Sequence, residues 1–404
     1  EKGSIFFALK GENFNGNQYA LMALEKGCSY ALVDEDVDPG NEKIIKVDNV
    51  LKFLQDLANF HRKRFSIPLI GITGTNGKTT TKELIAKVLE RKFSLAYTRG
   101  NLNNHIGVPL TLLSMDKEEV AVIEMGANHP GEIAYLTGLV NPTVAIINNA
   151  ASAHLEGFGS IEGVARAKGE LFDSAGPDTT CVINADDDYA GLWQTVAAPR
   201  PVVTFGLESP ADIGAGWQGD INTSELELWT PQGTATTTIA LPGRHNVMNA
   251  LAASAAALAL GIDLSVIAAG LAAARPVHSR WQAQAGISGS RIIDDTYNAN
   301  PASLQAGLAL LAAADTEAWL VLGDMGELGD SGERLHHLMG EAARRAGVQR
   351  LFTLGELAGL AVSAFGKGAQ AFDDVDADQS RCGIECTGNR AHQRRQQSRD
   401  DQSL

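Results

Sequence analysis

The sequence contains an apolar stretch that runs into a glycine-rich turn and then into a helical pattern. This order predicts a strand, a loop and a helix in succession. The apolar stretch covers residues 68–72, and the helical pattern covers residues 79–90. Glycines let a backbone wrap around an anion, while successive N–H groups and a helix N-terminus point at it. Lys78 adds a positive charge, and Thr79 offers a hydroxyl where a nucleotide-bound Mg²⁺ would lie. The pattern predicts a site for the phosphates of ATP or GTP, formed by Gly74, Thr75, Asn76, Gly77, Lys78, Thr79 and Thr80.

The spacing of this turn departs from the G-x4-G-K-[ST] pattern of common phosphate loops. Ile72 stands where that pattern has its first glycine, and the glycine lies one residue earlier, at Gly71. A purely structural glycine turn before an ordinary helix is the alternative interpretation.

The composition is that of an ordinary globular protein, since 44% of the 404 residues are hydrophobic and 20% are charged. This length predicts two or three domains. The formal net charge of −15 argues against nucleic acid or an anionic membrane as a partner. No stretch approaches the roughly 18 apolar residues of a membrane span, and nothing indicates an obligate protein partner. We therefore expect a monomer.

The four cysteines are scattered, which fits a reducing cytoplasm better than a disulfide scaffold. Cys382 and Cys386 lie close together in the sequence, but without a second pair of ligands they make a poor zinc site.

The pattern of strands and helices predicts several units along the chain. Residues 1–64 alternate short strands with helical stretches, as in a small α/β unit. Residues 65–275 repeat strand, loop and helix, and their apolar strands are typical of a parallel sheet covered on both faces. Within this unit, residues 204–240 resemble an antiparallel insertion, and residues 246–260 form an alanine-rich helix. A third α/β unit is expected over residues 276–376.

The character of the chain changes abruptly after about residue 376. From Gln379 onward, Ile384 and Leu404 are the only large aliphatic residues, too few to offset the entropy of ordering. We interpret residues 377–404 as an aberrant, disordered tail caused by a shifted reading frame or truncation, with a natural disordered tail as the alternative. We also expect the first unit to be truncated at its start.

Polar residues follow several predicted strands. Glu124 ends the apolar strand 120–123, and His154 follows the strand 144–147. Ligands of doubly wound sheets lie at the carboxyl ends of strands, and a carboxylate there suits Mg²⁺, which prefers hard oxygen ligands. A solvent-exposed glutamate and an ordinary loop histidine are the alternatives.

Three further groups are candidates. Lys168 lies in a predicted helix, where a lysine is normally a solvated charge. Asn246 and Asn249 open the alanine-rich helix, where their amides could cap the helix or pair with a base edge. Asp294 and Asp295 stand at a strand end among several asparagines, which packing alone does not explain well.

Taken together and in this order, the motifs resemble those of the Mur ligases of peptidoglycan synthesis, over roughly residues 3–376. The most specific segments are residues 5–12, 71–79, 100–109, 124–129, 153–156, 167–170, 243–246, 295–300 and 323–329. The unusual spacing of the phosphate loop is itself that of the family. The resemblance implies a three-domain α/β architecture, with a central P-loop ATPase domain built on a parallel sheet and a Rossmann-like C-terminal domain.

The resemblance implies an ATP-dependent reaction with Mg²⁺ as cofactor. The terminal carboxylate of UDP-N-acetylmuramoyl-tripeptide would attack the γ-phosphate of ATP, and the amine of D-alanyl-D-alanine would then attack the acyl phosphate. A sister ligase of Mur or folylpolyglutamate type is one alternative. The family's early uridine-binding segment and its late Lys-Gly-Ser-Arg-type loop find no match in this sequence. An ATP-binding but ligation-defective chain is therefore a second alternative.

The resemblance also implies roles for individual residues. Lys78, Glu124, His154 and Lys168 would be catalytic, with Lys78 on the β- and γ-phosphates. The metal ligands would be Thr79, Glu124, His154 and Lys168, the last as a carbamate. Asn249 would meet the adenine, Arg280 the phosphates and Asp295 the ribose. Lys10, Asn103 and Asn104 would lie on the side of the UDP-linked substrate.

Overall fold

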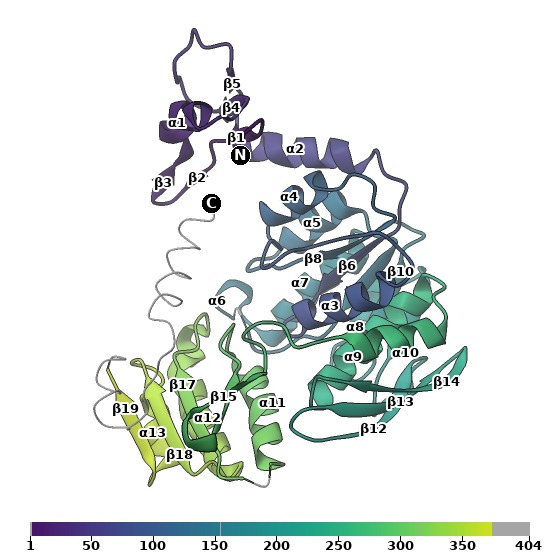
Figure 1. The fold of residues 1–404 in the computed structure, drawn as a ribbon, viewed down its shortest axis with the longest axis vertical. Coiled ribbons are helices and arrows are strands. Elements are labelled where there is room, and N and C mark those ends of the chain that lie inside the picture. Colours follow the sequence, from purple (N-terminus) through teal and green to yellow (C-terminus); the bar gives the residue numbers. More distant parts are fainter. Residues whose placement is uncertain (1, 154, 315, 374–404) are drawn as a thin grey trace. The chain divides into compact units, whose positions relative to one another are not determined.

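The computed structural model describes residues 2–153, 155–314 and 316–373 (Figure 1). The chain separates into two compact units that divide between Phe65 and Ser66. The tail predicted over residues 377–404, with Cys382 and Cys386, lies outside the described residues. The expected domain boundaries at residues 64 and 275 stay predictions.

The first unit is a small α/β structure. Its sheet has the order β1-β4-β5 with parallel pairing, and the strands are β1 (Ile5–Phe7), β4 (Tyr30–Val33) and β5 (Ile44–Lys46). A short hairpin and the helices complete the unit: β2 (Lys10–Gly11), β3 (Phe14–Asn15), η1 (Gly16–Tyr19), α1 (Ala20–Glu25) and α2 (Val50–Arg62). Asn49 begins α2 by accepting a hydrogen bond from the N–H of Lys52. Small buried residues, Ala8, Ala20, Ala31 and Val33, form the core.

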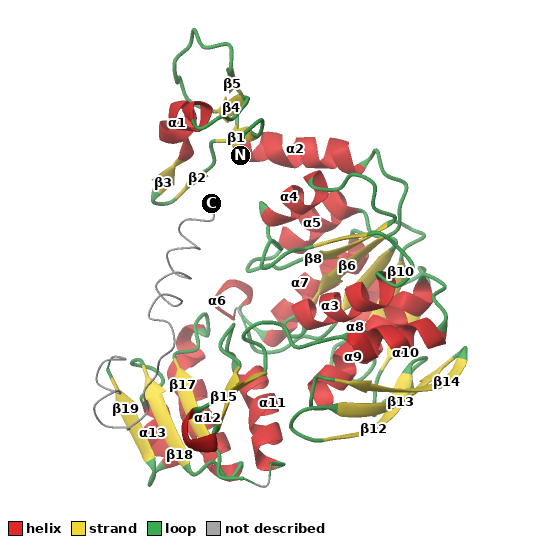
Figure 2. Ribbon diagram, in the orientation of Figure 1, coloured by secondary structure: helices red, strands yellow, loops and turns green. Residues whose placement is uncertain are grey.

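The second unit is built on a parallel sheet, whose strands β6, β8 and β10 are labelled in Figure 2. In the described chain its strand order is β11-β10-β9-β6-β8-β7. The strands are β6 (Leu69–Thr73), β7 (Leu95–Tyr97), β8 (Val120–Glu124), β9 (Val144–Ile147), β10 (Thr180–Asn184) and β11 (Val202–Phe205). The first strand in sequence, β6, lies inside the sheet, and later strands are added on both of its sides. This reversal creates a crevice at the carboxyl end of β6, where doubly wound sheets bind ligands.

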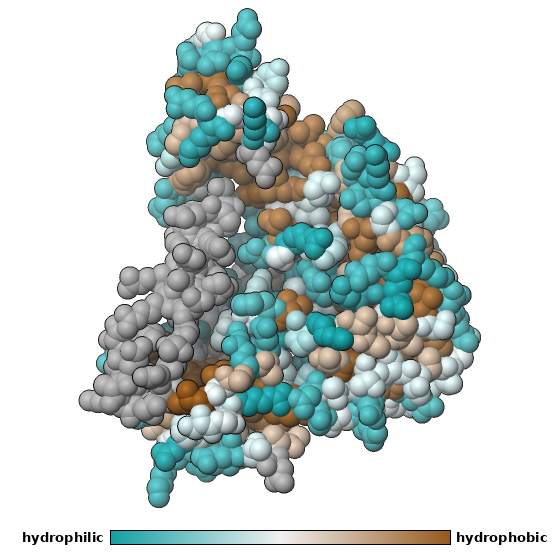
Figure 3. Space-filling model, in the orientation of Figure 1, coloured by the Kyte–Doolittle hydropathy of each residue, from teal (hydrophilic) through white to brown (hydrophobic). Residues whose placement is uncertain are grey.

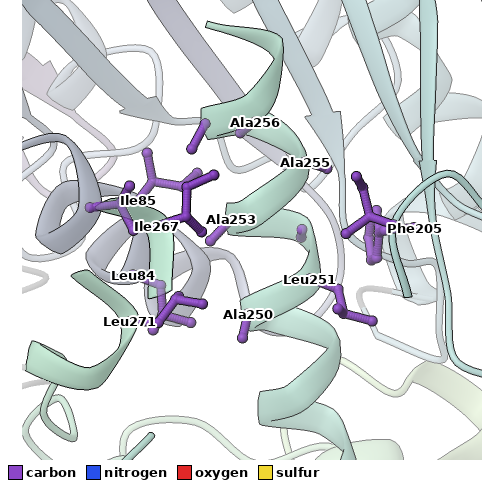
Figure 4. Close-up of a cluster of buried hydrophobic side chains, with 14 of the residues drawn as sticks. Leu84, Ile85, Phe205, Ala250, Leu251, Ala253, Ala255, Ala256, Ile267 and Leu271 are labelled. Atoms are coloured by element: carbon purple, nitrogen blue, oxygen red, sulfur yellow. The ribbon is translucent and has the colours of Figure 1, made fainter. Parts of the chain in front are cut away.

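Helices cover the sheet in two packed groups. One group is α3 (Lys78–Leu89), α9 (Arg244–Ala259) and α10 (Leu264–Ala273), and the other is α4 (Gly107–Leu113), α5 (Glu132–Val140), α7 (Ile161–Asp173) and α8 (Ala190–Ala197). The short helix α6 (Leu155–Phe158) precedes α7. The alanines of α9 are buried nearly throughout, because small side chains let α9 lie close to Leu84 and Ile85 of α3 and to Phe205 (Figure 4).

The predicted antiparallel insertion is present but shorter than expected. It consists of β12 (Gly214–Gly219), β13 (Ser224–Thr230) and β14 (Gly233–Ile239), joined by antiparallel pairing. The first residues of the predicted segment instead belong to β11, which pairs in parallel with β10. Val202–Phe205 is thus the edge strand of the main sheet.

The C-terminal part of this unit contains two further sheets. The strands β15 (Gln282–Ala285) and β16 (Arg291–Asp294) pair antiparallel, whereas β17 (Trp319–Gly323), β18 (Arg350–Leu354) and β19 (Ala369–Phe372) pair in parallel. The helices are α11 (Pro301–Ala312), α12 (Gly332–Arg345) and α13 (Leu360–Phe365), with the short turns η2 (Ile287–Gly289) and η3 (Gly329–Ser331). The parallel sheet and its helices share an apolar core around Leu322, Leu351 and Ala361.

Hydrophilic and hydrophobic side chains are interspersed over the face shown in Figure 3. In the part of the chain that the structure describes, no helix is both long and apolar enough to cross a bilayer.

The contact between α10 and α3 generates a stability prediction. A Cβ atom at Gly270 would lie 2.5 Å from the Cα of Val88, so Gly270→Ala must push the two helices apart. We expect a loss of about 1–3 kcal/mol, the usual cost of overpacking, seen as a lower apparent Tm. Gly138→Ala in α5 is the matched control, because its Cβ meets nothing within 4 Å and alanine favours the helix. Equal apparent Tm values for the two variants would contradict this packing.

Candidate active site

The phosphate loop joins β6 to α3, and its glycines are required by close contacts. Gly74 and Gly77 have positive φ angles of 146° and 78°. A Cβ at Gly77 would lie 2.2 Å from Oδ1 of Asn249, and one at Gly74 would lie 2.9 Å from Cβ of Asn148. The loop therefore lies directly against two asparagines. Helix α3 begins at Lys78, directly after the loop, so the unpaired N–H groups of its first turn point toward the loop.

The Lys78 side chain bends back over the loop. Its Nζ donates hydrogen bonds to the carbonyl oxygens of Gly74 at 2.7 Å and Thr75 at 3.0 Å. Burial lowers the pKa of Lys78, as Arg280 does, whereas Glu124 raises it. The ammonium group is thus placed where an anion on the loop would meet it.

Glu124 lies beside this loop because β8 pairs with β6. The register places Ile72 opposite Glu124. Oε1 of Glu124 accepts hydrogen bonds from Oγ1 of Thr79 at 3.2 Å and from Nδ2 of Asn103 at 3.0 Å. Arg280 in turn donates from Nη2 to Oγ1 of Thr79 at 3.1 Å. The structure therefore brings together two of the four predicted metal ligands, Thr79 and Glu124.

The chemistry of these donors fits Mg²⁺. Glu124 is 2% exposed, and among the described residues its Oε2 has no hydrogen-bond partner. A hydroxyl and a carboxylate are hard oxygen ligands, and Mg²⁺ takes its remaining ligands from phosphate and water. The described residues contain no group of three His, Cys, Asp or Glu that could hold a metal by themselves. A metal at this place would therefore take most of its ligands from water or from the phosphates of a nucleotide.

Lys168 of α7 is a buried amine and not the solvated charge that its helical position suggests. It is 1% exposed, its Nζ lies 3.5 Å from the carbonyl oxygen of Ala127, and it stands over the ring of Phe158. Burial and the nearby Lys78 lower the pKa of Lys168 to about 7, although Glu132 and Glu170 raise it. A large fraction of this amine is thus neutral, and hence nucleophilic, near neutral pH.

The segment after α10 also lies against the loop. Asn300, the N-cap of α11, donates a hydrogen bond from Nδ2 to Oδ1 of Asn76 at 2.7 Å, and Asn76 donates back at 3.4 Å. The Arg280 guanidinium stacks on the ring of Tyr297. Asp295 accepts a hydrogen bond from the N–H of Trp281 at 3.1 Å, and partial desolvation raises the pKa of its carboxyl group.

Several predicted site residues form hydrogen bonds with other parts of the protein. Oδ1 of Asn249 accepts a hydrogen bond from Oγ1 of Thr81, and Asn246 donates to the carbonyl oxygen of Pro242. Oδ1 of Asn104 accepts the N–H groups of Ile106 and Gly107 and so starts α4.

Lys10 and His154 are two further predicted site residues. Lys10 belongs to the first unit, where it forms ion pairs with Asp34 at 2.8 Å and Glu35 at 2.9 Å. His154 lies outside the described residues, so its metal role stays a prediction.

A cleft of about 670 Å³ contains the loop, Glu124, Lys168, Asn249, Arg280 and Asp295. The cleft is also lined by residues for which the sequence predicted no role, namely Asn148, Asn149, Asp186, Asp187, Arg244 and His245. Oδ1 of Asn149 accepts the N–H of Asn76, and Oδ2 of Asp187 accepts the N–H of Ala150. Asn149 follows β9 and Asp187 follows β10, and only the strand order places them beside β6.

A parallel sheet whose inner strand runs into a glycine-rich phosphate loop, with an acid on the neighbouring strand, defines a P-loop nucleotide-binding protein. Residues 72–257 match the Mur ligase middle domain, and residues 279–381 match the Mur ligase, glutamate ligase domain. The UDP-N-acetylmuramoyl-tripeptide–D-alanyl-D-alanine ligase of Escherichia coli (strain K12) is 39% identical over 92% of this chain and 82% of that protein. The enzyme of the same name from Bacillus subtilis (strain 168) is 38% identical over 88% and 78%. The chain belongs to the Mur ligase family.

Solved structures agree with this assignment. MurF from Acinetobacter baumannii superposes with a TM-score of 0.89 at 35% identity, over 94% of this chain and 83% of that one. MurF ligase from Thermotoga maritima in complex with ADP gives 0.84 at 28% identity, over 93% and 86%. The predicted family and α/β fold class are confirmed.

The buried Lys168 predicts an unusual pH dependence of stability. The unfolded lysine keeps a proton up to pH about 10.4, whereas the folded one loses it near pH 7. Between these values the unfolded chain binds more protons, so this residue makes the folded state more stable as pH rises. Lys168→Met removes the effect.

In CO₂-free buffer, the apparent Tm of Lys168→Met minus that of the unaltered protein should therefore fall between pH of about 7.5 and about 9.5. Lys117→Met, at an exposed lysine, is the control and should show a constant difference. Parallel profiles of apparent Tm against pH for Lys168→Met and the unaltered protein would show that the pKa of the Lys168 amine is not lowered.

Proposed function

We propose that this chain catalyses ATP-dependent ligation of D-alanyl-D-alanine to UDP-N-acetylmuramoyl-tripeptide, releasing ADP and phosphate, in peptidoglycan precursor synthesis. The observation that carries the proposal is the cluster of Lys78, Thr79, Glu124 and Lys168 in a single cleft. The relatives that bear this ligase's name support it, since they match about nine-tenths of the chain at 33–39% identity.

The reaction needs an activated acid, because a carboxylate is a poor electrophile. A carboxylate oxygen of the tripeptide attacks the γ-phosphorus of ATP, the bond to the bridging oxygen breaks, and ADP leaves. The amine of the dipeptide then attacks the acyl carbon, and the tetrahedral intermediate expels phosphate while the amine loses a proton. Catalysis of such steps consists mostly of positioning and charge neutralisation.

The residues of the cleft suit these tasks. Lys78, Arg280 and the N-terminus of α3 would hold the phosphates, because each offers positive charge or N–H donors to the same place. Asn249 would contact the adenine and Asp295 the ribose, both from the walls of the cleft. Asn103 and Asn104 would face the muramoyl peptide, and Lys10 would serve the UDP-linked substrate from the first unit.

Thr79 and Glu124 would hold Mg²⁺, and its charge would neutralise the phosphate oxygens. A neutral Lys168 amine can attack CO₂, form a N–C bond and release a proton, which gives a carbamate with anionic oxygens. We infer that this carbamate, together with His154, supports a second metal. The lowered pKa of Lys168 supports the inference, since only an unprotonated amine reacts in this way.

We further infer a cytoplasmic monomer with three domains, over residues 1–64, 65–275 and 276–376, and with no nucleic acid or membrane partner. The net charge of −15 supports the last point, since it opposes polyanions and anionic lipid surfaces.

The direct test is ADP release with ATP, Mg²⁺, UDP-N-acetylmuramoyl-tripeptide and D-alanyl-D-alanine, omitting each component in turn. We expect turnover only when all are present, because the acyl phosphate forms on one substrate and is consumed by the other. Single amino acids and glutamate as acceptors probe the sister ligases. Turnover with these and none with D-alanyl-D-alanine would overturn the proposed substrate, and ATP binding without turnover would indicate a ligation-defective chain.

The proposed carbamate makes a second prediction. Lys168→Ala should lose on the order of 100-fold or more in turnover, as expected for a lost metal-supporting ligand, and a small carboxylate such as acetate should partly restore it. Lys117→Ala serves as the control for adding acetate. Full activity of Lys168→Ala without acetate would remove Lys168 from the mechanism.

A further inference from the structure

A second lysine of α3, Lys82, is buried at the back of the site and has no part in the mechanism above. It is 1% exposed and is among the largest fully buried side chains of the described chain. Its Nζ donates a hydrogen bond to the carbonyl oxygen of Thr98 at 2.7 Å, and it lies 3.2 Å from Oε1 of Glu83. It also lies 3.8 Å from Oε2 of Glu124.

The two oxygens of Glu124 have different surroundings. Oε1 accepts hydrogen bonds from Thr79 and Asn103, on the cleft side. Oε2 is buried and has no hydrogen-bond partner among the described residues, and the Lys82 ammonium lies 3.8 Å from it. A buried carboxylate oxygen in this position is costly unless a positive charge compensates it.

The Lys82 ammonium is held by a hydrogen bond to Thr98, the residue that follows β7, and makes no hydrogen bond to Glu124. The carbonyl oxygen of Thr98 accepts its hydrogen bond, while Oγ1 of the same Thr98 accepts the N–H of Glu124 at 3.0 Å. Thr98 therefore fixes both Lys82 and the backbone of Glu124. At 3.8 Å from Oε2, the ammonium acts on Glu124 through charge and leaves the lone pairs of Oε2 uncommitted.

We propose that Lys82 is a positioning residue, a built-in counter-ion that balances the Glu124 carboxylate when no divalent cation is bound. The inference rests on the proposed metal role of Glu124. Lys82 keeps the charged carboxylate in place in the empty site, and a divalent cation that arrives takes over part of its neutralisation. Lys82 and the metal therefore compete for the charge of Glu124.

Lys82→Met tests this, because methionine keeps the apolar stem and removes the charge. The probe is Mn²⁺ alone, without nucleotide, with binding followed by electron paramagnetic resonance and stability by the apparent Tm. In the metal-free protein the variant should have a lower Tm, since Glu124 lacks its counter-ion. Mn²⁺ should then raise its Tm more than that of the unaltered protein, and should bind on the order of tenfold more tightly.

Matched variants separate charge from packing. Lys82→Arg keeps the charge and should respond to Mn²⁺ like the unaltered protein. Adding Lys82→Met to Glu124→Gln should change neither the Mn²⁺ affinity nor the Mn²⁺-dependent Tm shift, and this neutral pair should fold even where Lys82→Met alone does not. Glu83→Gln should not change the Mn²⁺ response, because the carboxylate that would bind Mn²⁺ is that of Glu124.

Equal Mn²⁺ responses in Lys82→Met and the unaltered protein, including no response in either, would overturn the inference and leave Lys82 a packing residue. A Lys82→Met effect that persists in the Glu124→Gln background would overturn it as well. Ligation by the unaltered protein is measured separately, in the turnover assay. Absence of ligation there would count against the proposed function, whereas ligation with equal Mn²⁺ responses would remove only the role of Lys82.

Discussion

The site depends above all on the parallel pairing of β6 with β8 on one side and β9 on the other. In this register Ile72 lies opposite Glu124, and Thr73 lies opposite Ile147. The phosphate loop, the acid and the asparagines after β9 therefore leave the sheet at the same edge. A slip of one residue would turn Glu124 to the other face, so the apolar residues that fix the register also fix the chemistry.

The same edge gathers charged side chains of both signs. Lys78, Lys168 and Arg280 line the cleft, and so do Asp187, Asp295 and the buried Glu124. Carbonyl oxygens of the loop accept hydrogen bonds from Lys78, and burial lowers the pKa of Lys168. The two cations at the phosphate loop, Lys78 and Arg280, are placed for a ligand that brings negative charge there, as the phosphates of a nucleoside triphosphate do.

Local patterns were enough to predict the strand, loop and helix around Lys78 and the acid at the end of β8, because each is encoded within a few residues. The strand order depends on contacts between distant segments, so the roles of Asn148 and Asp187 could not be predicted. Burial of Lys168 has the same origin, since its helical position alone favours a solvated charge. Asn104 was predicted to lie near the substrate, and in the structure its side chain accepts the N–H of Gly107 at the start of α4. Short polar side chains are common at helix starts, so the sequence alone could not separate the two roles.

Activation through an acyl phosphate transfers one carboxylate oxygen of the substrate to the released phosphate, and this transfer can be measured. UDP-N-acetylmuramoyl-tripeptide labelled with heavy oxygen in its terminal carboxylate would be turned over with ATP and D-alanyl-D-alanine, and the released phosphate analysed by mass spectrometry. Attack of the carboxylate on the γ-phosphorus predicts one labelled oxygen in each phosphate, with the other retained in the new amide. Unlabelled phosphate from productive turnover would contradict activation through an acyl phosphate.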